Sequence, residues 1–206
     1  MYARSTTVHG DPKRMDEGIA YVRDTVMPAV RQMAGCTGLS MLCDRESGRC
    51  IVTTAWRDEM SMHDTESAVH DLRRRAAETM AGRAEVQEWE IALMHRMHEA
   101  HHGACTRVIY GRMDPDRLDD GLSTMRMSLL PRMEELPGFC SISCMIDRET
   151  GRTAASVTYD SPADMERAAA QAKALREEFA GGVGMQITEM QEFDLALAHL
   201  RVPEMA

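Results

Sequence analysis

The chain of 206 residues is long enough for one large domain or two small ones, and its 44% hydrophobic and 28% charged residues are typical of a globular protein. Its formal net charge of −9 disfavours nucleic acid and anionic membrane surfaces as main partners, because both require a basic field. No stretch approaches the roughly 18 apolar residues of a membrane span, and the start "MYARSTTVHGDPKR" lacks the apolar core of a signal peptide, so we expect a cytoplasmic protein.

The first predicted element is a strand at residues 3–9, which are rich in Thr and Val. Asp11-Pro12 then marks a turn and the start of a helix. Apolar residues follow at helical spacing, and they are Met15, Ile19, Val22, Val26 and Met33. Pro28 lies inside this pattern, so we expect it to kink the helix or to begin a new last turn.

Two strands joined by a polar turn are predicted next. Leu39, Met41 and Cys43 alternate along the first strand, and the second strand is Cys50–Trp56. Between them lies "DRESGR" (Asp44–Arg49), in which Asp opens a turn and the late Gly permits a positive φ. A hexapeptide with two arginines and two acids is also compatible with phosphate binding, but its position favours the tip of a hairpin. An amphipathic helix at about residues 61–80 and a strand containing "VQEWEIAL" complete the unit.

The rest of the chain repeats this unit. "DRESGR" returns as "DRETGR" (Asp147–Arg152), 103 positions later, and the same offset relates Trp56 to Tyr159. Late in the unit the offset becomes 104, where "QEWEIAL" matches "QEFDLAL". Because matched positions keep their order along about 95 residues, the pattern indicates a tandem duplication. The second copy has its own apolar residues at helical spacing, namely Leu118, Leu122, Met125, Leu129 and Met133, with Pro131 in the place of Pro28.

Each unit therefore has the order β-α-β-β-α-β, which predicts an α+β protein made of two ferredoxin-like units. The boundaries that we predict are residues 1–94 for the first unit, 95–104 for a His-rich linker and 105–206 for the second unit. The sheet faces that the helices leave uncovered carry apolar side chains. We therefore expect the two sheets to pack against each other as an intramolecular pseudo-dimer, and we leave further homo-oligomerisation open.

With this element order the chain resembles the dimeric α+β barrel superfamily, and within it the antibiotic biosynthesis monooxygenase (ABM)-like domains. Besides the order of elements, the resemblance rests on "LPGF" (Leu136–Phe139) before a strand and on "TTAWRD" (Thr53–Asp58) before a helix that carries histidine. It covers both units. The resemblance implies a pseudo-dimeric α+β barrel within one chain, and a ligand cavity between a sheet and its helices.

The resemblance also implies several activities. Some members are cofactor-free monooxygenases that oxidise polycyclic aromatic molecules with O₂, some degrade haem, and others are cyclases, isomerases or proteins without established activity. We therefore expect a cofactor-independent monooxygenase that acts on a small apolar or aromatic molecule. The alternative is a non-catalytic protein of the same fold that binds a small molecule or assembles through its surfaces, and haem binding or degradation is a third reading.

Trp56 and Tyr159, which end the third strand of each unit, are candidate substrate-binding residues. Family members often carry Trp at this position, where it lines the cavity. The alternative is a core aromatic that packs helix against sheet. Arg4 and Arg107 are an identical pair on the first strands, and they are candidates to anchor an acidic substrate by bidentate hydrogen bonds. Their alternative role is to form ion pairs between the halves.

His63 and His70 are the candidate catalytic residues, because they lie seven apart on one helix face and a histidine on this helix is an iron ligand in haem-degrading relatives. Either one is a candidate acid, base or ligand. Their counterparts are Glu166 and Lys173, so only one half has the histidines. The haem-degrading relatives carry Asn on the first strand, where residues 4–7 of this chain read RSTT, which argues against haem breakdown. The alternative is that both histidines are solvated.

The linker contains His95, His98 and His102, which would share a face if it were helical and would then suit zinc or nickel. A solvated connector is the reading that we favour, and we predict no metal site. The six cysteines include no CxxC pair, and the chain has no Gly-rich phosphate loop or Ser-His-Asp order. Oxygen chemistry without a cofactor leaves little trace in a sequence, because the substrate supplies the electrons.

Overall fold

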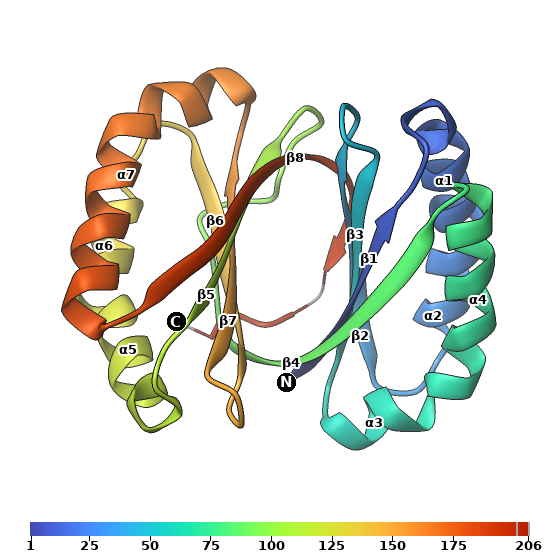
Figure 1. Cartoon of the computed structure of the whole chain (residues 1–206), viewed down its shortest axis with the longest axis horizontal. Coiled ribbons are helices and arrows are strands. Elements are labelled where there is room, and N and C mark those ends of the chain that lie inside the picture. Colours follow the sequence, from blue (N-terminus) through green and yellow to red (C-terminus); the bar gives the residue numbers. More distant parts are fainter. Residues whose placement is uncertain (201, 206) are drawn as a thin grey trace. The chain divides into compact units, whose positions relative to one another are not determined.

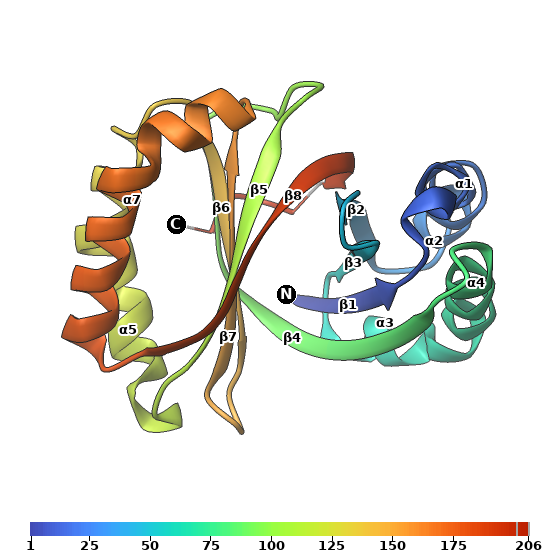
Figure 2. The same cartoon turned by 45° about the horizontal axis from the view of Figure 1, so that its top comes forward.

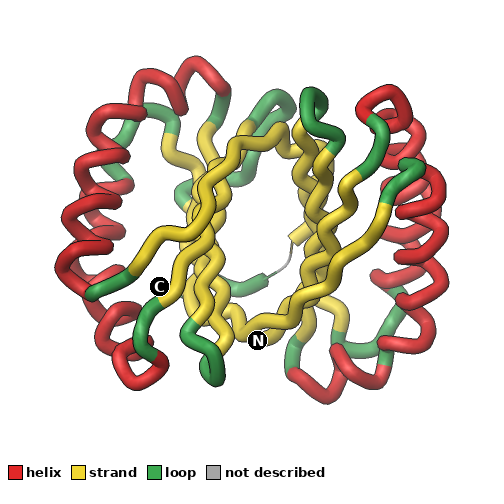
Figure 3. The backbone as a smooth tube through the Cα atoms, in the orientation of Figure 1, coloured by secondary structure: helices red, strands yellow, loops and turns green. Residues whose placement is uncertain are grey.

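The computed structural model describes residues 1–200 and 202–205, and they form two compact units. Met1–Trp89 and Asp194–Val202 make up the first unit, and Glu90–Phe193 and Pro203–Ala206 make up the second. Within each unit the helices lie on one face of the strands (Figure 1, Figure 3). The predicted α+β class is confirmed.

The first unit and the strand that leaves it follow the predicted order of elements. They are β1 (Tyr2–His9), the 3₁₀ turn η1 (Pro12–Arg14), α1 (Met15–Tyr21), the π-helical segment η2 (Val22–Val26), α2 (Met27–Arg31), β2 (Cys36–Asp44), β3 (Arg49–Trp56), α3 (Glu59–Asp64), α4 (Glu66–Thr79) and β4 (Arg83–Arg96).

The second half of the chain repeats this order. Its elements are β5 (Cys105–Arg112), the 3₁₀ turn η3 (Pro115–Arg117), α5 (Leu118–Thr124), the π-helical segment η4 (Met125–Leu129), α6 (Leu130–Met133), β6 (Phe139–Asp147), β7 (Arg152–Tyr159), α7 (Pro162–Val183) and β8 (Gln186–Leu200).

The strands of the two halves pair in the same register. In β1 and β3, Arg4 lies opposite Thr54, and in β5 and β7, Arg107 lies opposite Val157. Both partners in the second pair are 103 positions beyond those in the first. This agreement is what a tandem duplication would produce.

The last strand of each half is long and contributes to both units (Figure 2). Residues Glu90–Arg96 of β4 pair antiparallel with β6 of the second unit. Residues Asp194–Leu200 of β8 pair antiparallel with β2 of the first unit. In hydrogen-bonding order the eight strands run β1-β3-β2-β8-β5-β7-β6-β4 and close into a barrel.

The two hexapeptides are the tips of the β2–β3 and β6–β7 hairpins, as predicted. In the first, Asp44 Oδ1 accepts hydrogen bonds from the amides of Glu46 and Ser47, at 2.9 and 3.3 Å. Asp147 holds the second turn in the same way. Gly48 and Gly151 have φ of +75° and +69°, so they occupy the left-handed region that favours glycine. The aspartates thus hold the turns, whereas Arg45 and Arg148 pair with acids outside them.

The helix that we expected as one element at residues 61–80 is two helices, α3 and α4, which meet at Thr65. The Thr65 hydroxyl donates to the carbonyls of Ser61 and Met62, at 3.1 and 2.9 Å. Such side-chain bonds compete with the regular helical ladder. The counterpart of Thr65 is Ala168, which has no hydroxyl, and α7 is continuous from Pro162 to Val183.

Pro28 and Pro131 begin new last turns, α2 and α6, which was one of the two outcomes expected for Pro28. A π-helical segment precedes each proline. Proline has no amide hydrogen and its ring crowds the carbonyl four residues earlier, so the wider π turn accommodates it.

The segment predicted as a linker at residues 95–104 starts within a strand, because β4 continues through Arg96. No helix among the described residues has the length and apolar character needed to cross a membrane.

Replacing Gly151 with Ala should destabilise the protein, because the new Cβ would lie 1.9 Å from the carbonyl oxygen of Met113 and φ is positive. We expect the free energy of unfolding in a denaturant titration to fall by about 1–3 kcal/mol. Gly181→Ala is the matched control, because Gly181 lies in α7 with nothing within 4 Å of its added Cβ. It should stabilise the protein by about 0.5–1 kcal/mol. Equal effects of the two substitutions would contradict the assigned turn.

Candidate functional site

An apolar cavity of about 80 Å³ lies between the sheet and the helices of the second unit. This volume exceeds the roughly 10–15 Å³ that a single water requires, and it is below the roughly 300–1,000 Å³ of most small-molecule pockets, so a ligand with fused rings requires the cavity wall to move outward. Ile142, Cys144 and Ala155 line it from the sheet, and Leu118 and Leu175 line it from the helices. Burial raises the pKa of the Cys144 thiol to about 12, so the surroundings of this group disfavour negative charge.

Three polar side chains at the cavity wall are Arg107 from β5, Tyr159 from the end of β7 and Arg176 from α7. Tyr159 is 1% exposed and Arg107 is 8% exposed. Burial raises the pKa of the Tyr159 hydroxyl, and the positive charges of the two arginines oppose that rise. The cavity is therefore apolar along most of its wall and cationic at one place.

The two arginines of the second unit differ in their partners. Arg107 donates from Nε and Nη2 to Glu192 Oε1, at 3.1 and 2.6 Å. Among the residues that the structure describes, no side chain forms a hydrogen bond or ion pair with Arg176. Burial lowers the pKa of Arg176, and the charge of Arg107 lowers it further. A positive charge at the cavity thus lacks a paired acid.

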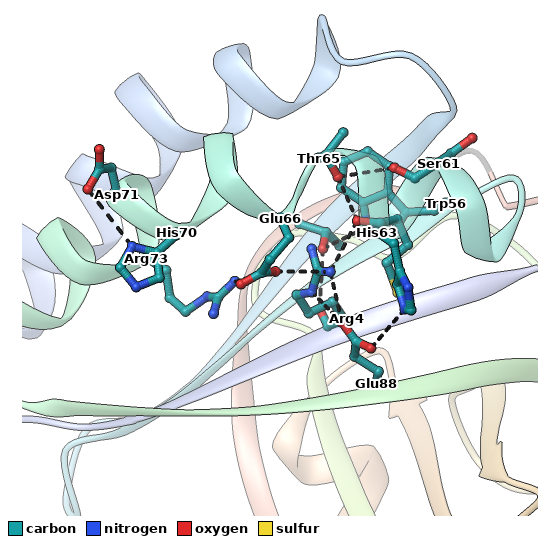
Figure 4. Close-up of polar contacts among 12 residues, drawn as sticks. Arg4, Trp56, Ser61, His63, Thr65, Glu66, His70, Asp71, Arg73 and Glu88 are labelled. Atoms are coloured by element: carbon teal, nitrogen blue, oxygen red, sulfur yellow. Dashed lines mark hydrogen bonds and ion pairs between the residues drawn. The ribbon is translucent and has the colours of Figure 1, made fainter.

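The corresponding arginines of the first unit both pair with glutamates (Figure 4). Arg4 has a side chain only 1% exposed, and its Nη2 lies 2.8 Å from Glu88 Oε1 and 3.0 Å from Glu66 Oε2. Arg73 Nη2 also lies 3.0 Å from Glu66 Oε2. Glu66 therefore bridges the two guanidinium groups. Both of the candidates on the first strands, Arg4 and Arg107, form ion pairs inside their own unit.

Trp56 is completely buried, and its indole donates to Thr54 Oγ1 at 3.1 Å. It belongs to the core of the first unit. On the sheet floor of the second unit, Tyr159, Ala155 and Cys144 stand in the places of Trp56, Val52 and Met41. These three residues are smaller than their counterparts, whereas Ile146 and Ile109, which also line the cavity, are larger than Cys43 and Thr6.

The structure does not bring His63 and His70 together, because they lie on α3 and α4 and have different partners (Figure 4). His63 Nε2 lies 3.1 Å from Glu88 Oε2, and its side chain is 54% exposed. His70 lies 3.9 Å from Asp71 and is 63% exposed. Both histidines are therefore exposed, and each has a carboxylate near one ring nitrogen.

A group of residues that can hold a metal contains His98, which the sequence analysis named as a candidate ligand, together with two residues that it missed. His98, Cys140 and Asp160 have ligand atoms within 4.8 Å of one another, the one such group among the residues that the structure describes. These donors suit zinc. His95 instead contacts Glu134 and Glu204, at 2.9 and 2.5 Å. Sequence spacing gave no signal, because Cys140 and Asp160 come from another part of the chain.

The fold defines the class of protein to which the chain is similar. It aligns with a candidate monooxygenase from Lactobacillus acidophilus NCFM at a TM-score of 0.71 and 10% identity, covering 97% of this chain and 96% of the other. An anthrone oxidase-like protein aligns at 0.68 and 12% identity, covering 96% and 91%. A Listeria monocytogenes ferredoxin-fold protein related to antibiotic biosynthesis monooxygenases aligns at 0.56 and 10% identity, covering 95% and 94%. These likenesses establish an ABM-like fold.

Sequence comparison places the chain more narrowly. It is 46% identical over 205 residues to the uncharacterized protein Rv2557 of Mycobacterium tuberculosis H37Rv, covering 100% of this chain and 92% of the relative. It is 47% identical over 206 residues to the uncharacterized protein Rv2558 of the same strain, covering 100% and 87%. The chain belongs to the family of these two mycobacterial proteins. No family model matches it.

Replacing Arg4 with Met should destabilise the protein, because Glu66 and Glu88 lose the buried cation that they share. Both carboxylates are partly exposed and can be hydrated, so we expect a loss of about 1–3 kcal/mol in the free energy of unfolding. Arg45→Met is the control, because Arg45 is half exposed and pairs with an exposed Asp16. Its effect should stay within about 1 kcal/mol. An equal loss in both variants would contradict a structural role for the Arg4 pairs.

Proposed function

We propose that the chain is an ABM-type oxidoreductase that oxidises a small apolar or aromatic molecule with O₂ and without a cofactor. The observation that carries the proposal is the apolar cavity of the second unit, which reaches Tyr159 and Arg107. A cavity with few polar groups is the usual form of a small-molecule site. We propose that Tyr159 and Arg107 contact the substrate, and that Trp56 and Arg4 hold the matching positions in the first unit.

The chemistry requires a substrate that supplies its own electrons. An anthrone is such a molecule: anthrone and O₂ give anthraquinone and water, so that one oxygen atom enters the carbonyl group and the other leaves as water. The fold likeness to an anthrone oxidase-like protein motivates this probe. In this proposal the protein excludes bulk water and positions the reacting carbon. His63, beside Glu88, is the candidate acid or base if the first unit also binds substrate.

We also propose that the chain arose by tandem duplication and that its halves work as a pseudo-dimer in which only the second has kept a working cavity. The common register of β1–β3 and β5–β7 supports the duplication. The apolar cavity in the second unit supports the division of roles.

The alternative is a non-catalytic protein that binds a small molecule in the same cavity. The described residues that line the cavity include no carboxylate and no histidine, which favours this alternative. Binding without turnover would distinguish it from the oxidoreductase.

Cys144→Met should close the cavity, because Met is the residue at the corresponding position of the first unit, Met41. With anthrone and isotopically heavy O₂, we expect the wild-type protein to form anthraquinone containing one heavy oxygen atom. The variant should lose about tenfold or more of this activity, since the added methylenes take up space needed by the substrate. Product is measured by mass spectrometry and O₂ uptake with an electrode.

Cys36→Met is the control for this experiment, because it adds the same side chain in the first unit, outside the cavity. Its activity should equal that of the wild type. Bound anthrone without product would favour the non-catalytic alternative, and equal activity of Cys144→Met and wild type would place the reaction outside the cavity.

A further inference from the structure

We propose that the natural ligand of the second-unit cavity is an amphipathic monoanion, with its carboxylate between Arg107 and Arg176 and its apolar body in the cavity. The inference rests on the proposed small-molecule function and adds the chemical class of the ligand. It is carried by a difference between the two halves at a single helix position.

That position is Glu66 in the first unit and Ala169 in the second, 103 residues later. Glu66 Oε2 lies 3.0 Å from both Arg4 and Arg73, and it joins them (Figure 4). The counterparts of these arginines, Arg107 and Arg176, are both present in the second unit and both line the cavity. The methyl group of Ala169 cannot replace the missing carboxylate.

No other acid has taken over the role of Glu66 among the residues that the structure describes. Arg107 pairs with Glu192, whereas Arg176 pairs with none. Glu166, which replaces His63, is exposed and forms no ion pair with either arginine. Glu177 is next to Arg176 in the chain, but it pairs with Lys173 at 3.8 Å.

The positive charge at the cavity wall, from Arg107 and Arg176, indicates that the ligand is an anion. Arg107 is paired with Glu192, whereas Arg176 feels the charge of Glu177 but has no carboxylate in ion-pair contact among the described residues, so one carboxylate can pair with it directly. Burial of Arg176 and the proximity of Arg107 disfavour its charged form, and a bound anion would relieve both effects. Planar guanidinium groups bind carboxylates through paired, charge-assisted hydrogen bonds.

The rest of the cavity wall indicates that the other end of the ligand is apolar. Its wall away from the arginines consists of aliphatic and sulfur-containing side chains from the sheet and from the helices. The high pKa of Cys144, about 12, shows that a second negative group there would be unfavourable. A molecule with one carboxylate and an apolar body satisfies both ends, whereas a neutral hydrocarbon satisfies only one.

The test compares two probes that share one ring system, naphthalene-2-carboxylate and naphthalene-2-methanol, by isothermal titration calorimetry. For the wild-type protein we expect the carboxylate to bind about tenfold to a hundredfold more tightly than the alcohol, as charge-assisted hydrogen bonds would give. Ala169→Glu rebuilds the bridge of the first unit, so it should remove this preference while binding of the alcohol stays unchanged.

Ala169→Gln is the matched control, because it has nearly the shape of Glu without the charge, and it should retain the preference for the carboxylate. Arg176→Met is the second variant, and it should lower carboxylate binding alone. Thermal unfolding checks that each variant is folded.

The outcomes separate the two proposals. Equal affinities of the wild type for the two probes would overturn the monoanion and leave an apolar ligand in place. Equal effects of Ala169→Glu and Ala169→Gln would also overturn it, because bulk alone would then explain the loss. Failure of the wild type to bind either probe would remove the cavity as a ligand site, and both proposals with it.

Discussion

A buried guanidinium group must be paired, and this requirement organises the region around the first strand of each unit. Arg4 and Arg107 lie on β1 and β5 with almost no exposed side-chain surface, and an unpaired charge there would cost several kcal/mol. Both pair with a glutamate from the last strand, Glu88 on β4 and Glu192 on β8. The ion pairs therefore connect the beginning and the end of each β-α-β-β-α-β unit.

The last strands, β4 and β8, also supply acids to both units, because each strand passes from one unit into the other. On β4, Glu88 pairs with Arg4 of the first unit, and Glu90 pairs with Arg148 of the second, at 2.6 Å. On β8, Glu192 pairs with Arg107, and Asp194 lies 3.8 Å from Arg45 of the first unit. In both strands acids two residues apart serve different units. A change of register in either strand would disturb the arginine pairs of both.

Much of the fold could be predicted from the sequence, because it depends on local and repeated signals. The hexapeptide turns needed only an aspartate and a late glycine, and the 103-residue offset gave the order of elements twice. The break at Thr65 was missed, because the apolar pattern continues across it and the hydroxyl competes only locally. The resemblance implied a cavity between a sheet and its helices, but which half contains it could not be predicted, because that depends on the summed volumes of side chains on several elements. The offset did align Glu66 with Ala169, but the meaning of that difference required knowledge of what Glu66 contacts.

The divergence of the halves is consistent with one unit specialised for stability and the other for a ligand. In the first unit, Trp56 and Met41 are buried on the sheet face, and the carboxylate of Glu66 pairs with both Arg4 and Arg73. In the second, an apolar cavity lies beside Tyr159 and Cys144, and Ala169 supplies no carboxylate to Arg107 and Arg176 at the cavity wall. Such a wall also suits the proposed oxidation. An anthrone reacts with O₂ after it loses a proton, and a site with one net positive charge stabilises the anion that forms. The same arginine that would hold a carboxylate would thus favour the reactive form of an acidic aromatic substrate.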